Sequence, residues 1–375
     1  MRYLLAVCAF FCITVVSAQD YYMFVGTYTS GKSKGIYVYK FNSANGEVEW
    51  VSNTDSAANP SFLALAPDGT HLYAVNEISR AQAGLVSAYH FDPASGKLSF
   101  INQQSSGSEN PCHISITKDG KWVAVANYTG GSLSVFPIKS DGSLQPFAQH
   151  IMHTGKGINP QRQEKPHVHS AFFSPDEKFL LTPDLGIDKI SVYRFDTKAA
   201  MPLQPAAIPN IAVEAGNGPR HLDFSPDGKY MYLIEEMGGT VSVYSYRNGT
   251  TKFEQRIATH PADFKGQPGS ADIHVSPDGR FLYASNRGDE NNLAIFSINA
   301  GNGKLNSVGY QSTEGVQPRN FIIDPTGKFL LVANQKTNNI VVFKRDTATG
   351  LLQRTLQQIE VPSPVCLKML KIATR

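Results

Sequence analysis

One recurring unit constrains the fold of this chain more than any other feature. It consists of a short apolar run, a turn centred on Asp-Gly or a close variant, and a second apolar run that usually ends in Asn or an acid. Its copies cover residues 59–77, 110–128, 167–185, 218–236, 269–287 and 317–335. Equivalent turn positions lie 51, 57, 51, 51 and 48 residues apart. Spacing of this length is typical of four-stranded propeller blades.

Each copy predicts a β-hairpin followed by further strands. Asp-Gly between two apolar runs is a strong hairpin signal, because Gly accepts the positive φ of a tight turn. A third run rich in Val, Ile, Tyr and Phe follows each pair, as in residues 240–247. If the loop at Asp227 and Gly228 holds two residues, Arg220 faces Glu235 across the hairpin.

The two ends of the repeat array complement each other. Residues 23–50 read as strands two to four of a blade without its first strand, and residues 361–370 read as a first strand without a blade. Joining them closes a ring and removes exposed sheet edges, whereas a linear solenoid would leave both fragments unpaired. We therefore predict an all-β, seven-bladed β-propeller of four-stranded antiparallel blades, formed by residues 19–375 as one domain.

The N-terminus predicts a signal peptide over residues 1–18. Arg2 precedes an apolar run over residues 4–16, and Val16-Ser17-Ala18 fits signal peptidase cleavage before Gln19. The run is too short for a membrane span. The alternative, a buried first strand, would need a blade that lacks one. We expect an exported protein, periplasmic or secreted, without a membrane span after cleavage.

Charge and cysteine content limit which partners and which covalent links can be expected for this chain. The 34 basic and 31 acidic residues nearly balance and are scattered, so nucleic-acid binding is not indicated. After cleavage Cys112 and Cys366 remain, in blades that are not neighbours, so we expect two buried thiols and no disulfide. Short blade edges predict a monomer.

Polar residues concentrate at one mouth of the predicted central channel, where first strands begin and second strands end. The first strands contribute His167, His169, Arg220, His221, Arg319 and Asn320. The second strands and their turns contribute Asn76, Glu77, Asn127, Tyr128, Asp184, Glu235, Glu236, Asn286, Arg287, Asn334 and Gln335. Taken singly, each could cap a strand or form a structural ion pair. Together they indicate an active site for an anionic substrate.

A metal at this mouth is a weaker interpretation. His167 and His169 fall on one face of a strand, so a pair of imidazole ligands is conceivable. No third and fourth ligand is evident in the sequence, and a catalytic zinc needs at least three protein ligands. We predict neither a metal nor a cofactor.

Several motifs resemble one family of propellers. VGTYTSG from Val25, PHVHS from Pro166, GPRHLDFSPDGKYMYLIEE from Gly218, LYASNRG from Leu282 and QPRNFIIDPTGKFLLVANQ from Gln317 are similar to the lactonase family. That family includes the propeller-type 6-phosphogluconolactonase and the fungal 3-carboxy-cis,cis-muconate lactonizing enzyme. The resemblance spans nearly the whole mature chain. It implies a metal-free site with four catalytic residues, His169, Arg220, Glu236 and Arg287.

The choice of glutamate stays open at this level. Family spacing favours Glu236, while the hairpin register places Glu235 opposite Arg220. Around these groups we expect a substrate-binding shell of His167, His221, Glu235, Asn127, Arg319 and Asn334.

These residue types suit lactone hydrolysis, which needs a base, an acid and a cation for the oxyanion. The substrate would be a small lactone or an anionic carboxylate. The first hypothesis is hydrolysis of a sugar-type lactone, although a phosphorylated lactone would not be plentiful outside the cytoplasm. Alternatives are a lactonizing cycloisomerase, a non-catalytic ligand- or protein-binding propeller, and a metal-dependent gluconolactonase-like propeller.

Overall fold

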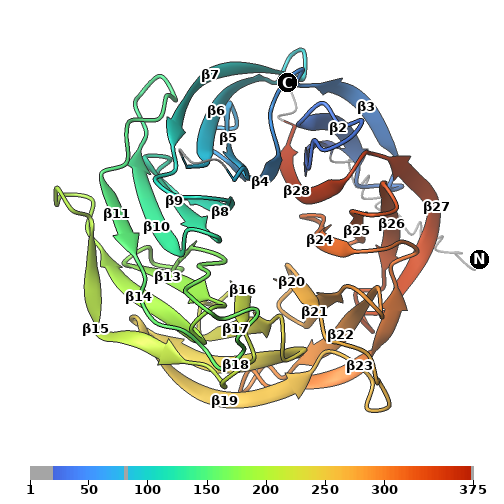
Figure 1. Cartoon of the computed structure of the whole chain (residues 1–375). Helices are drawn as coiled ribbons and strands as arrows, with labels where there is room; N and C mark the ends of the chain where they lie inside the picture. Colours follow the sequence, from blue (N-terminus) through green and yellow to red (C-terminus); the bar gives the residue numbers. More distant parts are fainter. Residues whose placement is uncertain (1–19, 80–82, 373–375) are drawn as a thin grey trace, which may run out of the picture.

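The computed structural model describes residues 20–79 and 83–372, and it shows a closed ring of seven antiparallel sheets with four strands each (Figure 1). The innermost strands surround the central axis of the ring, and the outermost strands form the rim (Figure 1). Inner-strand residues such as Phe62, His113 and His221 line a pocket on this axis, the central channel. The predicted seven-bladed all-β propeller is confirmed.

Every blade runs outward from the channel in sequence order except the one that holds both termini. That blade contains, from inside to outside, β28 (Pro364–Lys371), β1 (Asp20–Thr27), β2 (Tyr37–Asn42) and β3 (Val48–Asn53). The next contains β4 (Pro60–Leu65), β5 (His71–Asn76), β6 (Leu85–Asp92) and β7 (Lys97–Ser105). The third contains β8 (Pro111–Ile116), β9 (Trp122–Asn127), β10 (Ser132–Pro137) and β11 (Gln149–Met152).

The remaining four blades follow the same order. The fourth blade contains β12 (Phe172–Phe173), β13 (Phe179–Asp184), β14 (Lys189–Phe195) and β15 (Leu203–Ala212). Then come β16 (Pro219–Phe224), β17 (Tyr230–Glu235), β18 (Thr240–Arg247) and β19 (Thr250–Ala258). The sixth blade contains β20 (Ser270–Val275), β21 (Phe281–Asn286), β22 (Asn292–Ile298) and β23 (Leu305–Ser312). The last is β24 (Pro318–Ile323), β25 (Phe329–Asn334), β26 (Asn339–Arg345) and β27 (Leu352–Glu360).

The ring is closed by β28 pairing with β1. The register runs from Tyr21 opposite Lys371 to Gly26 opposite Cys366, as the complementary ends of the sequence predict. Cys366 is fully buried and so is Val25 in the same pair of strands. Closure gives β1 a partner on both sides and leaves no inner strand without a blade.

The hairpin turns keep the predicted register, but with a longer loop. Ser225 pairs with Tyr230 (N to O, 2.9 Å), so the loop spans residues 226–229 instead of two residues. Gly228 has φ of 69°, and its N–H donates to Ser225 O at 2.8 Å. Only glycine takes this conformation without strain. Because the loop is still centred on Asp227 and Gly228, the same residues face each other across the hairpin as with a two-residue loop.

Near the channel mouth the register slips by one residue, which corrects one prediction. His221 pairs with Ile234 as expected, but Pro219 pairs with Glu235, so Arg220 lies in a β-bulge and does not face Glu235. The same slip occurs near the start of β4, β8, β20 and β24. Bulges bend a strand and re-aim its side chains. In each of these five blades, the bulge therefore redirects one side chain near the channel mouth.

Neighbouring blades are joined by apolar packing and by a recurring tyrosine contact. The hydroxyl of Tyr73 donates to Gly142 O in the next blade at 3.0 Å. Tyr232 and Tyr283 make the equivalent bonds, to Gly303 O at 3.1 Å and to Gly350 O at 2.7 Å. These three tyrosines are fully buried, so the bonds satisfy hydroxyls that would otherwise be costly inside the core.

The N-terminal prediction lies outside the described residues, since placement begins at Asp20. Across residues 20–79 and 83–372, no helix is long and apolar enough to cross a membrane. Cys112 and Cys366 are both buried and unpaired, as expected.

Truncation after Ser363 tests the role of ring closure. Removing β28 takes away a channel-lining strand and leaves β1 as an unpaired inner edge, so we expect loss of the cooperative thermal transition seen by circular dichroism. A chain that ends at Ile372 retains the whole strand and serves as the control. Retention of the full-length melting temperature by the shorter chain would contradict this account.

Candidate active site

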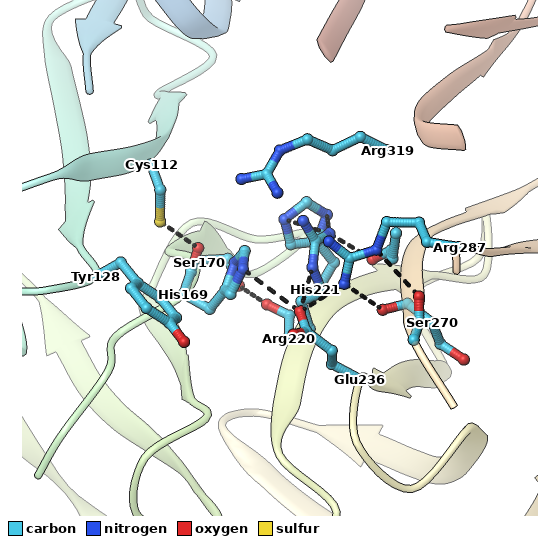
Figure 2. A network of polar contacts seen from close by, with 12 residues as sticks. Cys112, Tyr128, His169, Ser170, Arg220, His221, Glu236, Ser270, Arg287 and Arg319 are labelled. Atoms are coloured by element: carbon cyan, nitrogen blue, oxygen red, sulfur yellow. Dashed lines mark hydrogen bonds and ion pairs between the residues drawn. The ribbon is translucent and has the colours of Figure 1, made fainter. Parts of the chain in front are cut away.

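Two positions of the repeat deliver side chains to one end of the channel. The first is the bulged residue of the inner strand, such as Arg220. The second is the residue after the second strand, such as Glu236 after β17 or Arg287 after β21. Because strands of adjacent blades begin and end at matching heights, these positions meet, and Figure 2 shows their side chains converging from neighbouring blades.

The carboxylate of Glu236 is the centre of the site. Its Oε2 accepts Arg220 Nε at 3.0 Å and Arg287 Nη2 at 2.9 Å (Figure 2). Its other oxygen, Oε1, accepts Arg162 Nη2 at 2.7 Å. Burial alone would raise the pKa of Glu236, but the guanidinium groups, Arg287 foremost, hold that pKa far below its usual range. Glu236 is therefore ionised in this state and is a poor proton donor.

His169 lies beside this carboxylate. Its Nε2 is 3.9 Å from Glu236 Oε2, and its side chain is 6% exposed. Nδ1 is buried without a hydrogen-bond partner in the described part of the chain. Burial, and then the positive charge of Arg220, lower the pKa of His169 well below its ordinary value. The imidazole is consequently neutral at pH 7, which is the form that can accept a proton.

Arg220 is supported by a second acid, Asp272, which acts through His221. Its Nη1 lies 3.3 Å from His221 Nε2 and 3.4 Å from His221 Nδ1, and Nη1 also donates to Ala271 O. His221 Nδ1 is 2.8 Å from Asp272 Oδ1. Burial and the neighbouring Arg220 lower the pKa of His221 to about 3, so the neutral ring carries its proton toward Asp272. This series of contacts fixes the position of Arg220.

Arg287 is anchored by backbone carbonyl groups. Nε donates to Gly269 O at 3.0 Å, and Nη2 donates to Ser270 O at 3.3 Å (Figure 2). Burial lowers the pKa of Arg287, although Glu236 opposes the shift. Burial, and then Arg287, also lower the pKa of Arg220, to about 10. Arg220 remains cationic at neutral pH, because its pKa of about 10 lies well above 7.

Arg319 is a half-buried cation at the same opening, with a side chain that is 19% exposed, and its guanidinium group is available for a ligand. Its ring contact is Tyr28 at 5.5 Å, and its one ion pair is Glu77 at 4.0 Å, within the part of the chain that is described. The Tyr28 hydroxyl donates to Glu77 Oε2 at 2.8 Å. Figure 2 shows Arg319 pointing into the opening without a bond to Glu236.

Some predicted site residues lie outside this network. Glu235 is fully buried and accepts hydrogen bonds from Ser242 Oγ at 2.6 Å and Asn217 Nδ2 at 2.6 Å. Asn127 and Asn334 donate to the backbone carbonyls of Ser106 and Thr313. Each of these three residues, the last of its second strand, thus binds a neighbouring loop, whereas Glu236, the residue after Glu235, enters the site.

His167 also lies apart from Glu236. Its ring stacks on Tyr128 with centroids 4.6 Å apart, and Nε2 is 3.2 Å from Glu164 Oε1. Tyr128 in turn makes an edge contact with His169 at 5.3 Å. Tyr128 therefore contacts both histidines. Across the described residues, no group of three or more His, Cys, Asp or Glu side chains is arranged to hold a metal ion.

Two members of the network were missed by the sequence reasoning. Arg162 comes from the segment between β11 and β12, which belongs to the interval of 57 residues, the longest between repeats. That insertion was a signal that an extra loop reaches the channel. Asp272 lies two residues into β20 at an inner-strand position, where a lone acid among apolar residues could have been noticed.

Comparison with known proteins places this arrangement in one family. The family described as "Lactonase, 7-bladed beta-propeller" matches residues 22–369. The chain belongs to this lactonase family. A 6-phosphogluconolactonase of Formosa agariphila is 45% identical over 353 residues, which cover 92% of this chain and 99% of the relative. A 6-phosphogluconolactonase of Bacillus subtilis is 38% identical, with 93% and 98% covered.

A solved structure agrees with both. The periplasmic gluconolactonase of Pseudomonas aeruginosa has a TM-score of 0.90 and 40% identity, with 94% of this chain and 100% of that chain covered. The resemblance seen in the sequence is thereby confirmed as family membership. Within a lactonase propeller, the neutral imidazole, the ionised carboxylate and the arginines offer a base, a charge anchor and oxyanion donors.

Proposed function

We propose that this protein hydrolyses a sugar-type lactone at the Glu236 end of the central channel. The observation that carries the proposal is the neutral imidazole of His169 placed 3.9 Å from an ionised carboxylate, amid buried arginines. Ester hydrolysis needs this combination, because a proton must move while negative charge develops on the carbonyl oxygen. The names of its relatives, 6-phosphogluconolactonase and gluconolactonase, support the same reaction class.

In the proposed reaction His169 acts first as a base. It takes a proton from a water molecule while the water oxygen bonds to the lactone carbonyl carbon. The carbonyl oxygen becomes an oxyanion, and its charge is stabilised by N–H groups of Arg319 and Arg287. When the ring C–O bond breaks, the imidazolium returns its proton to the departing alkoxide. The product is an open-chain hydroxy acid, which releases a proton on ionisation.

Glu236 has a supporting role in this scheme. An acid held in its ionised form by three guanidinium groups cannot serve as the proton donor. It instead stabilises the imidazolium that forms on His169 and fixes Arg220 and Arg287 in place. Arg319 has no such carboxylate within 3.5 Å in the described residues, so its N–H groups are available to the substrate carbonyl or to the product carboxylate.

An activity assay with matched histidine variants tests the proposal. We expect the mature protein to release protons from gluconolactone or 6-phosphogluconolactone, and to do so with a chelator present, since guanidinium groups supply the positive charge. His169→Ala should lower kcat/KM by about 10²- to 10⁴-fold, the usual contribution of a positioned base. His167→Ala removes an imidazole two residues away and should cost far less.

Either of two results would contradict the proposal. One is the absence of turnover by folded wild-type protein on both lactones. The other is equal loss of activity in the two histidine variants, which would indicate a structural effect of the strand.

The pH profile provides a separate test of His169. A base with its pKa lowered below 6.5 stays neutral at pH 6.5, so kcat/KM should remain flat from pH 8 through 6.5 and fall only at more acidic pH. Arg220→Gln should move the midpoint of the acid limb to higher pH, because one of the charges that disfavour the imidazolium is removed. The measurement is initial rate against pH, corrected for spontaneous hydrolysis. A midpoint at or above 6.5 in the wild type would contradict this assignment.

We also propose that residues 1–18 direct export and that the mature chain begins at Gln19. The cleavage pattern in the sequence and the periplasmic location named for the Pseudomonas aeruginosa gluconolactonase support this. N-terminal sequencing of protein recovered from a periplasmic or culture fraction should read from Gln19. Recovery of the intact N-terminus from the cytoplasm alone would overturn the proposal.

A further inference from the structure

Arg162 differs from the other cations of the site in its exposure and its origin. Its side chain is 44% exposed, whereas those of Arg220 and Arg287 are 2% and 11% exposed. It belongs to the loop between β11 and β12, not to a strand or hairpin end. Of the three guanidinium groups that contact Glu236, that of Arg162 is therefore the one that faces solvent at the channel mouth.

The loop backbone around Arg162 is fixed. Gln163 is fully buried, and its Nε2 donates to Leu185 O at 2.8 Å while its Oε1 accepts Asn159 N at 3.1 Å. The N–H of Arg162 donates to Asn159 Oδ1 at 3.1 Å. Movement at this position is therefore expected in the side chain, with the loop itself staying in place.

The side chain of Arg162 is held by few contacts. Within the described residues it bonds through Nη2 alone, to Glu236 Oε1 at 2.7 Å and to Tyr128 Oη at 3.3 Å. The N–H groups on Nε and Nη1 remain available for a ligand. Once Nη2 leaves Glu236, the guanidinium group can bind a carboxylate or phosphate through two parallel hydrogen bonds, one from Nη2 and one from Nη1 or Nε.

The charge balance of the site favours an anionic ligand. Arg162, Arg220, Arg287 and Arg319 supply four guanidinium groups, while Glu236 and Glu77 supply the two carboxylates in contact with them. Asp272 compensates part of the excess through His221. Because Glu236 keeps Arg220 and Arg287 as partners, it can lose Arg162 without becoming an unpaired buried charge.

We propose that Arg162 determines the preference of the enzyme for charged substrates. An anionic group on the lactone, remote from the reacting carbonyl, binds the Arg162 guanidinium and draws it from Glu236. The released Oε1 then faces the opening and becomes available to a substrate hydroxyl or to the imidazolium of His169. This inference rests on the proposed lactone hydrolysis and identifies the residue that distinguishes phosphorylated from neutral sugar lactones.

Steady-state kinetics of Arg162→Gln on 6-phosphogluconolactone and gluconolactone test the inference. Loss of charge-assisted hydrogen bonds should lower kcat/KM for the phosphorylated lactone by about 10- to 100-fold, mostly through KM. The neutral lactone should lose much less, so the ratio of the two kcat/KM values should fall. Arg162→Lys, which keeps the charge but loses the planar donor pair, should retain part of the preference.

Lys165→Ala is the matched control, since it removes an exposed cation from the same loop. It should change the ratio of the two kcat/KM values little. Equal loss on both lactones in Arg162→Gln, or the same change of ratio in Lys165→Ala, would overturn the inference.

Binding measurements keep this test independent of turnover. Calorimetric titration with 6-phosphogluconate and gluconate, the two hydrolysis products, should show that Arg162→Gln weakens the phosphorylated acid selectively. If the wild type hydrolyses neither lactone, the proposed function fails, yet selective weakening would still support Arg162 as the anion-binding residue. Unchanged affinity for 6-phosphogluconate would reject that role.

Discussion

The pairing of β28 with β1 is the constraint on which the rest of the molecule depends. Each blade packs against two neighbours, and this order can be continued around the axis only if the first and last strands share a sheet. An open array would leave the inner edge of β1 unpaired and would not bring the blades of Glu236 and Arg319 to a common channel. Ring closure is thus both the source of stability and the means of assembling the site.

The second device is the bulge at the start of the inner strands. A regular hairpin would place Arg220 opposite Glu235, with the two side chains on the same face of one blade. The slip of one residue leaves Arg220 unpaired and aims it at Glu236, which follows the end of the second strand. Equivalent bulges in other blades place Cys112 and Arg319 around the same axis. A local irregularity repeated around a ring therefore becomes a convergent site.

Buried charge is the third element. Taking several guanidinium groups out of water is costly unless each has a partner. Glu236 compensates Arg220 and Arg287 directly, and Asp272 supports Arg220 through the neutral ring of His221. Burial, and then the same positive surroundings, lower the pKa of His169 and keep it neutral. One electrostatic arrangement therefore holds the arginines, fixes the charge of the glutamate and prepares the histidine for proton transfer.

The sequence by itself determined the number of blades, the strands of each and the closing pair, because the repeat spacing, the turn glycines and the hydrophobic patterns are local properties. It also indicated the end of the channel where polar residues gather, since repeat position sets the height of a residue along the axis. It did not distinguish Glu235 from Glu236, because one bulged residue changes which side chain enters the channel. It did not reveal Arg162 or the support of Arg220 by Asp272. The Arg162–Glu236 and His221–Asp272 contacts join residues 74 and 51 positions apart, and only the closed ring, which sets the distances between blades, brings them together.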